Sequence, residues 1–226
     1  MKLIKTVSGT VCIRVSGDEA VPPLGVDLRQ LIDFIATTYQ FAVKPQMPQG
    51  LIIPINQPLL FQAGVMTKEN DKWPITQLVS VQNGDMVTAA STEIADAVLE
   101  DYMSQLDKQL GFRFSQAEKR KVYLSGITVE FEKGIESQIR GLAEIEAILG
   151  RELKRTDPFK IKRLAFGWGD PVVPTDLNFQ TIESFDFTIE RRVDEPYSRN
   201  RYISIAPTTL SEHLRILQAI EDTLAG

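Results

Sequence analysis

The sequence has very little of the residues that most often bind transition metals or perform nucleophilic catalysis. Among 226 residues there is one cysteine, Cys12, and one histidine, His213. A single cysteine excludes an intrachain disulfide and a zinc site built from several cysteines. A single histidine excludes a three-histidine metal site within one chain. Cys12 lies in an apolar, β-prone run, which predicts a buried and unreactive thiol.

Long hydrophobic runs and known catalytic motifs are also missing. No stretch approaches the roughly 18 consecutive apolar residues of a membrane-spanning helix, and no apolar segment follows the basic N-terminal residues to complete a signal peptide. We therefore expect no membrane contact and a cytoplasmic location. The sequence contains neither of the glycine-rich phosphate-binding motifs nor a Gly-x-Ser-x-Gly nucleophile turn, so no cofactor is predicted.

The chain lacks an excess of positive charge. It carries 25 basic and 30 acidic residues, a net charge of −5, and neither half is net basic. A dedicated nucleic-acid-binding domain is usually net basic, so nucleic acid is disfavoured as a partner. Hydrophobic residues make up 43% and charged residues 24%, which is typical of a globular protein with its own core.

Hydrophobic periodicity predicts a mixture of strands and helices. Alternation over 127–131 and 185–192 is typical of half-buried strands, and Asn83-Gly84 is suited to a two-residue hairpin turn. Helical spacing with capping residues predicts helices over the ranges 27–41, 91–110, 136–149 and 209–224, and a capping box predicts a short basic helix over 115–121. Because strands and helices do not alternate regularly, we predict an α+β fold with a mainly antiparallel sheet and several amphipathic helices packed on it.

The length fits either one large domain or two small ones. We predict an N-terminal α+β lobe over residues 1–110 and a C-terminal α+β lobe over 111–226, which share one sheet if they form a single domain. Prolines interrupt an apolar run over 45–58, which indicates a loop covering the core or an arm that reaches another subunit.

The candidate partner-binding residues lie in the last sixty positions. Trp168 stands between two glycines, followed by Asp170, and can anchor a partner or close the end of the core. Four arginines lie around the strand ends and suit an acidic partner or pairing with nearby carboxylates. The full set of candidates is Trp168, Asp170, Arg191, Arg192, Arg199, Arg201 and His213. His213 falls at the flank of a helix, where a surface or boundary position is expected.

These observations leave two hypotheses of different classes. The first is a non-enzymatic interaction or assembly protein, a subunit of a larger cellular or viral complex, with a protein partner or a homo-oligomer. The second is a small-ligand or phosphoester-processing enzyme in which Arg191 or Arg201 converges with Asp170 or Glu190. The lack of a catalytic motif favours the first.

Overall fold

The fold is a single antiparallel sheet with helices packed on it. A computed structural model describes residues 1–15, 20–22, 25–46, 58–68, 71–81, 84–154, 160–167, 185–192 and 194–225. Within these ranges eight strands form one sheet in the order β2-β3-β4-β1-β5-β8-β7-β6, with every neighbouring pair antiparallel. The predicted α+β class is confirmed. No helix in the described part of the chain is long and apolar enough to cross a bilayer.

The strands and helices have the following bounds. The strands are β1 (Lys2–Val15), β2 (Leu59–Lys68), β3 (Asp71–Val81), β4 (Gly84–Ala89), β5 (Lys119–Glu130), β6 (Arg163–Phe166), β7 (Phe187–Arg191) and β8 (Arg201–Ala206). The helices are α1 (Leu28–Thr38), α2 (Thr92–Leu110), α3 (Ile135–Gln138), α4 (Leu142–Glu152) and α6 (Leu210–Ala225), with a 3-10 turn, η2 (Tyr197–Arg199).

The strand order repeats with two-fold pseudosymmetry. In each half a long strand is followed by helical structure, a three-stranded meander and a closing helix: β1, α1, β2–β4 and α2, then β5, α3–α4, β6–β8 and α6. The two long strands β1 and β5 pair at the centre, and each meander extends outward from them. The sequence has no visible repeat, so this duplication is apparent only in the topology.

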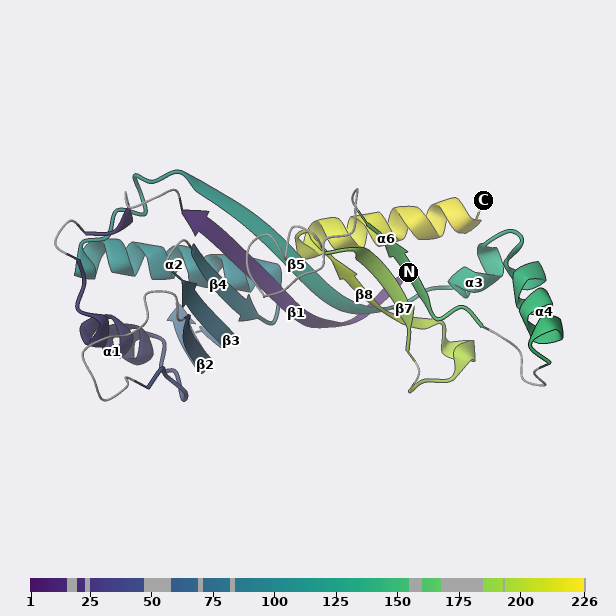
Figure 1. The fold of residues 1–226 in the computed structure, drawn as a ribbon, viewed down its shortest axis with the longest axis horizontal. Coiled ribbons are helices and arrows are strands. Elements are labelled where there is room, and N and C mark those ends of the chain that lie inside the picture. Colours follow the sequence, from purple (N-terminus) through teal and green to yellow (C-terminus); the bar gives the residue numbers. More distant parts are fainter. Residues whose placement is uncertain are drawn as a thin grey trace.

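Both closing helices cover the same face of the sheet (Figure 1). Lys121 and Ser125 lie on one side of β5, where Lys121 bonds Asp96 of α2 and Ser125 bonds His213 of α6. The first turns of the two helices meet where the Leu210 amide donates to the Thr92 hydroxyl at 2.8 Å. At this junction β1 passes so close to α2 that a Cβ on Gly9 would lie 2.0 Å from the backbone of Ser91.

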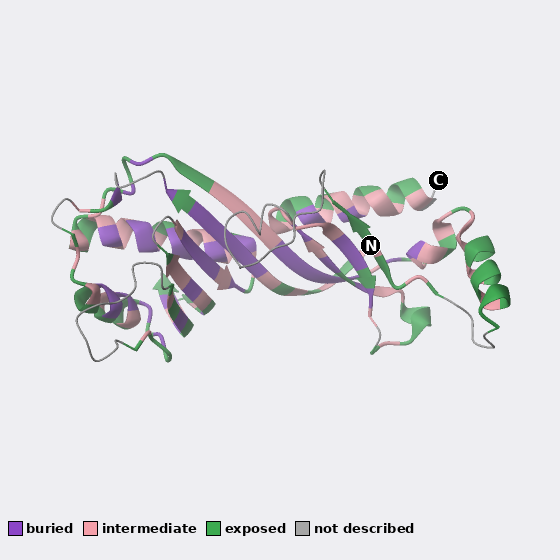
Figure 2. Cartoon of the chain, viewed as in Figure 1, coloured by how far each residue is buried: buried purple, intermediate pink, exposed green. Residues whose placement is uncertain are grey.

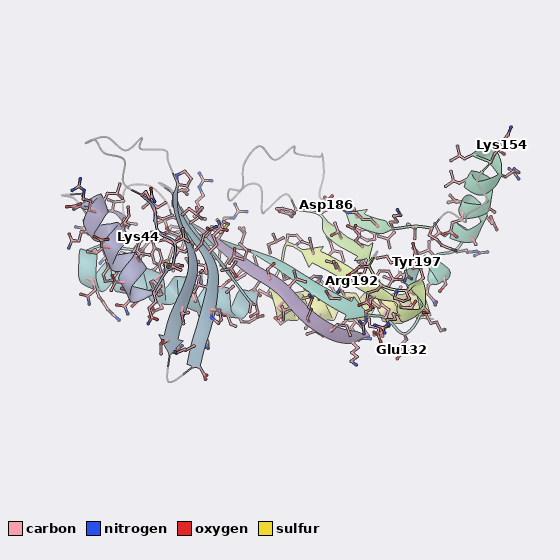
Figure 3. All side chains as sticks on the ribbon, turned by 90° about the horizontal axis from the view of Figure 1, so that it is seen from below. Lys44, Glu132, Lys154, Asp186, Arg192 and Tyr197 are labelled. Atoms are coloured by element: carbon pink, nitrogen blue, oxygen red, sulfur yellow. The ribbon has the colours of Figure 1, made fainter. Side chains whose placement is uncertain are left out.

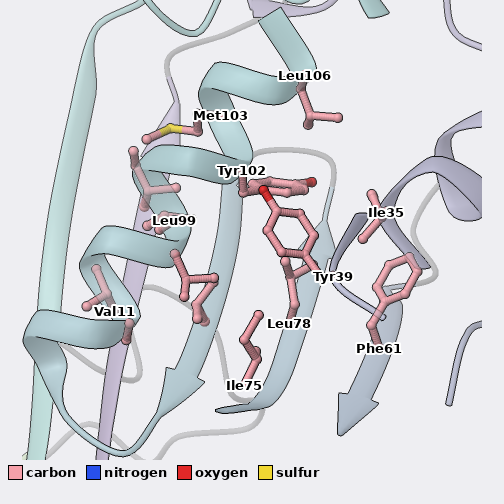
Figure 4. Packing of buried hydrophobic residues seen from close by; sticks show 14 of the residues in the cluster. Val11, Ile35, Tyr39, Phe61, Ile75, Leu78, Leu99, Tyr102, Met103 and Leu106 are labelled. Atoms are coloured by element: carbon pink, nitrogen blue, oxygen red, sulfur yellow. The ribbon is translucent and has the colours of Figure 1, made fainter. Parts of the chain in front are cut away.

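Each half has its own hydrophobic core on that face (Figure 2). In the N-terminal half, α1 and α2 pack against the sheet around Phe61, Leu78 and Tyr102 (Figure 4). In the C-terminal half, α3 and α6 pack around Ile127, Val129 and Leu217, which are fully buried. The opposite face carries a smaller cluster around Cys12 and Met86. The two-lobe division stays a prediction, because both halves share one sheet.

Most predicted elements are present, with bounds shifted by a few residues. Asp27 caps α1 by accepting a hydrogen bond from the Arg29 amide, and Ser91 caps α2 by accepting one from the Ile94 amide. Gly111 ends α2 in the left-handed region, with φ of 71°. These positions confirm that local capping signals identified the helix ends.

Two predicted helices were wrong. Lys119–Lys121 does not form a basic helix but begins β5, because pairing with the central strand β1 outweighs the local capping box. The helix predicted over 136–149 is broken by Gly141, whose φ of +80° is left-handed, so that α3 ends and α4 begins on either side of it. This break allows α4 to point away from the body of the protein (Figure 1).

Candidate functional site

Three of the candidate arginines form ion pairs with carboxylates at the ends of β7 and β8. Arg201 bonds both Glu130 and Glu195 at 2.8 Å, and Arg199 bonds Glu195 at 3.1 Å. Arg192 pairs with Asp194. These contacts lower the pKa of Glu195, through its bond to Arg201 first, and the pKa of Asp194 through Arg192.

Arg192, Arg199 and Arg201 are already paired with carboxylates of the same chain. Each of these arginines has a carboxylate partner on this chain, so the pairing that the sequence offered as an alternative is present for Arg192, Arg199 and Arg201. Arg199 and Asp194 are more than half exposed, so their ion pairs contribute little to stability and are screened by salt, whereas the pairs of Arg201 are partly buried. Binding of an acidic partner here would have to displace these carboxylates, and remains a prediction.

Arg191 does not belong to that surface. Its side chain is 4% exposed, and its guanidinium lies between the rings of Tyr197 and Tyr202, 4.3 and 4.7 Å from their centres. It donates to Glu136 of α3, to the Tyr202 hydroxyl at 2.8 Å and to the Tyr197 carbonyl at 2.8 Å. Arg191 therefore ties α3 to the end of the sheet and is covered on the side that the helices occupy.

His213 is buried, which corrects the expected surface or boundary position. Its side chain is fully buried, and its ring packs edge to face with the Phe187 ring, with the two ring centroids 5.5 Å apart. Its Nδ1 lies 2.7 Å from the Ser125 hydroxyl and its Nε2 lies 2.8 Å from the Ser204 hydroxyl. Ser204 donates its own proton to the Thr188 carbonyl at 2.7 Å, so it must accept from Nε2–H. Nε2 is thus protonated, and in a neutral ring Nδ1 accepts at 2.7 Å from the Ser125 hydroxyl, which also lies 3.5 Å from the Ala206 carbonyl.

Burial lowers the pKa of His213 to about 4, which keeps the ring neutral near pH 7. Both ring nitrogens bond to serines that face the core, and neither serine is exposed. The arrangement joins α6 to β5 and β8. A general base needs to reach a substrate, and this imidazole is enclosed by the protein.

Two candidates lie outside the described residues. Trp168 and Asp170 fall within 168–184, so their positions stay predictions. Most of the proline-rich segment, residues 47–57, also lies outside them, although Pro45, Gln46 and Pro58 are described.

The most exposed apolar surface of the described chain lies on α4, within the segment over 136–149 that was predicted as an amphipathic helix packed on the sheet. None of its residues is buried. The exposed fractions are 54% for Ile145, 49% for Ile148, 39% for Leu149 and 57% for Leu153, the C-cap. Figure 2 shows α4 exposed along almost its whole length, at the end of the molecule beyond α3.

The four side chains form a continuous stripe. Positions three and four apart lie on one face of a helix, so Ile145, Leu149 and Leu153 share a line and Ile148 lies beside it. Carboxylates stand one turn before and one turn after Ile148, at Glu144 and Glu152. The apolar stripe of α4, defined by Ile145, Ile148, Leu149 and Leu153, is therefore flanked by the carboxylate of Glu144 and by the ion pair between Glu152 and Arg151.

Few contacts attach α4 to the rest of the chain. Glu146 accepts from the Ile161 amide at 3.4 Å and from Lys160 at 3.1 Å, which links the middle of α4 to the segment before β6. Within the part of the chain that the structure describes, no helix covers the stripe. In other words, helical spacing predicted an apolar face correctly but could not tell whether the protein itself covers that face.

A cavity of about 550 Å³ opens at the opposite end of the molecule, between α1 and the segment that precedes β2. Its lining comprises Arg29, Ile32, Asp33, Ala42, Val43, Lys44, Pro45 and Gln46. Val43 is 50% exposed, whereas Ile32 is buried at the base. Lys44 bonds Asp33 at 2.6 Å, with both side chains more than half exposed. We call this cavity the α1 groove.

No metal site is apparent among the described residues: no three histidine, cysteine, aspartate or glutamate side chains gather there in a way that could hold an ion. The sequence matches no protein-family model, and no curated protein matches it significantly. Function is therefore inferred from the surfaces of the molecule.

Proposed function

We propose that this protein is a non-enzymatic interaction or assembly protein, and that α4 is its contact element. The main support is the apolar stripe of α4, which has carboxylates beside it and is not covered by any of the described residues. Contiguous exposed apolar patches generally mark interaction surfaces, whereas single exposed apolar residues do not. A projecting amphipathic helix suits insertion into a groove of a protein partner.

The apolar area of the stripe gives only weak binding by itself. Complete burial of a leucine or isoleucine contributes about 1.5–3 kcal/mol, and the four stripe residues are roughly half buried already, so covering them contributes about 3–6 kcal/mol. Association costs at least about 4 kcal/mol in lost translational and rotational freedom. The stripe needs polar contacts around it for stable binding, and Glu144 and Glu152 are placed to make them.

The remaining expectations for partner and location follow the same proposal. The partner is a protein or another copy of the chain, nucleic acid remains disfavoured by the net charge of −5, and the location is cytoplasmic. The second hypothesis, a ligand- or phosphoester-processing enzyme, is not favoured by a specific observation. Arg191 pairs with Glu136, and Arg201 pairs with Glu130 and Glu195.

Site-specific photocrosslinking in the cell that produces the protein tests this function. A photoreactive amino acid at position 148 is expected to give discrete protein adducts, and one at position 215 is the control because the Arg215 side chain is 74% exposed on α6. Replacing Ile145 and Leu149 by glutamine, which retains helix propensity, should abolish the adducts. If position 148 gives no protein adduct, or the same adducts as position 215, the proposed function is wrong.

A further inference from the structure

We propose that the outer edge of β6 pairs with the same edge of a second copy of the chain, so that the two sheets join across a two-fold axis. This contact is separate from the stripe of α4 and goes beyond the proposed function. β6 is the last strand of the sheet, and among the described residues it pairs only with β7. Figure 3 labels Asp186 and Arg192, which flank β7, and β6 lies beside that strand at the margin of the sheet.

The backbone of β6 presents hydrogen-bonding groups at this margin. The Arg191 amide donates to the Lys162 carbonyl at 2.8 Å, and the register between β6 and β7 continues from there without a bulge. Hydrogen-bonded and non-hydrogen-bonded pairs alternate in an antiparallel ladder, so Leu164 bonds toward β7 as Lys162 does. The amides and carbonyls of Arg163 and Ala165 therefore point outward. An edge of this kind is a template for another strand.

The N-terminal half shows what such an edge binds. The counterpart of β6 in that half is β2, which lies at the other margin of the sheet. An extended segment of the chain covers β2 there, because Val43 exchanges two hydrogen bonds with Gln62, at 2.9 and 3.1 Å, in an antiparallel bridge. Phe41 of the same segment packs on Phe61 of β2, with the ring centroids 5.4 Å apart. Within the described ranges no segment does this for β6, so an added strand would fill the equivalent place.

The side chains of β6 make its edge self-complementary. If two copies pair antiparallel with Ala165 opposite Ala165 of the second copy, Leu164 of each copy faces Phe166 of the other. These facing residues form non-hydrogen-bonded pairs, in which side chains approach most closely. Phe166 is 56% exposed, and its ring centroid lies 6.4 Å from that of Phe187, at the margin of the C-terminal core. The second copy would therefore cover an apolar ring that its own chain leaves open.

Charge does not oppose this register. Arg163 of one copy faces Gly167 of the other, and the two copies of Arg163 lie about 13 Å apart along the strands, beyond the screening length of about 10 Å at 0.1 M salt. Sliding the strands by two positions would instead place Phe166 opposite Lys162. A two-fold contact uses the same edge on both copies, so association closes at a dimer and does not continue into a filament.

Substitutions at the outward-pointing backbone test the contact. The contact is small, so we expect the wild type to form a dimer that dissociates on dilution, as measured by sedimentation velocity. Ala165→Pro removes an amide that points outward and leaves the ladder to β7 intact, so it should raise the dissociation constant at least tenfold. Ala165→Val keeps the amide and is the matched control, which should dimerise like the wild type. Circular dichroism and urea unfolding check that both variants fold.

Disulfide trapping tests the register. Leu164→Cys and Phe166→Cys are prepared separately, and the wild type, whose Cys12 is buried, is the control for background cross-linking. Under mild oxidation a mixture of the two variants should give a cross-linked dimer, because positions 164 and 166 face each other across the contact. Each variant alone should cross-link at least tenfold less. Efficient cross-linking of Leu164→Cys to itself would refute the proposed register.

Amide hydrogen exchange shows whether the edge is available. In the Ala165→Pro variant, which should be monomeric, the Arg163 amide is expected to exchange rapidly. Slow exchange there would mean that the edge is already bonded within one chain, and would overturn the inference.

The remaining outcomes separate this contact from the proposed function. A wild type that is monomeric at every concentration refutes the β6 pairing, while a protein adduct at position 148 would still support the role of α4. A dimer that survives Ala165→Pro but is lost when Ile145 and Leu149 are replaced by glutamine would assign dimerisation to α4 instead. A dimer that Ala165→Pro weakens as expected, without any adduct at position 148, would support the β6 pairing and refute the proposed function.

Discussion

Acidification should weaken this protein through its single histidine. In the folded state His213 is neutral, since burial lowers its pKa to about 4 and both nitrogens bond to serines. In the unfolded chain its pKa returns to the ordinary value of 6.5. Between these two values the unfolded state binds a proton that the folded state does not, so the free energy of unfolding decreases as the pH falls.

The magnitude follows from the separation of the two pKa values. Each pKa unit corresponds to about 1.4 kcal/mol, so the full effect is about 3 kcal/mol, developed between pH 6.5 and pH 4. At pH 5 the free energy of unfolding has decreased by about 2 kcal/mol through this effect.

A second buried group acts in the opposite direction. Burial raises the pKa of Asp85 to about 6, so its protonation stabilises the folded state as the pH falls below 6.

A difference measurement separates these effects. Urea unfolding of the wild type and of His213→Gln, each at pH 8 and pH 5, gives four free energies of unfolding. Asp85 is present in both proteins, so its contribution cancels, and the advantage of the wild type over the variant should decrease by about 2 kcal/mol between pH 8 and pH 5. Because the chain has one histidine, its imidazole NMR signals are unambiguous and should report the Nε2–H tautomer at neutral pH. A wild-type advantage that stays constant between the two pH values, or an imidazole that titrates near 6.5, would refute the reasoning.

Three further perturbations test other parts of the fold. Glu136→Gln leaves the Arg191 guanidinium buried without its carboxylate and should lower the free energy of unfolding by about 3–5 kcal/mol, whereas Asp194→Asn, at an exposed pair, should leave the urea midpoint unchanged. Burial raises the pKa of the Cys12 thiol to about 12, so a thiol reagent should label the native protein at least tenfold more slowly than the unfolded chain, and equal rates would contradict the buried position. Gly9→Ala places a Cβ against the start of α2 and should cost about 1–3 kcal/mol in urea unfolding, with a smaller effect showing that β1 and α2 can separate locally.

The elements that sequence reasoning predicted correctly are those determined by nearby residues. Ser91 and Gly111 bound α2 because a side-chain cap and a left-handed glycine act within a few positions. Lys119–Lys121 was misassigned because its strand forms only through pairing with β1, more than a hundred residues away. No local signal competes with the capping box there.

The burial of individual side chains was harder to predict than their periodicity. His213 is buried because Ser125 and Ser204 lie opposite it, and although Ser204 is nine positions away, Ser125 comes from β5, 88 positions earlier in the sequence. Ile148 has the spacing of a core residue, yet the left-handed turn at Gly141 directs its helix outward. A sign of this exists in the sequence, since Glu152 lies on the same helical face as Ile148, where a core helix would carry an apolar residue.

The central pairing of β1 with β5 also has a consequence for synthesis on the ribosome. β1 emerges more than a hundred residues before β5, which is its partner along its whole length and ends at Glu130. Until β5 has left the ribosome, the edge of β1 that β5 will occupy has unpaired amides and carbonyls. Nascent chains that stall before that point would expose this edge to other chains, so we expect ribosome-associated chaperones to bind the segment from β1 to β4 during translation.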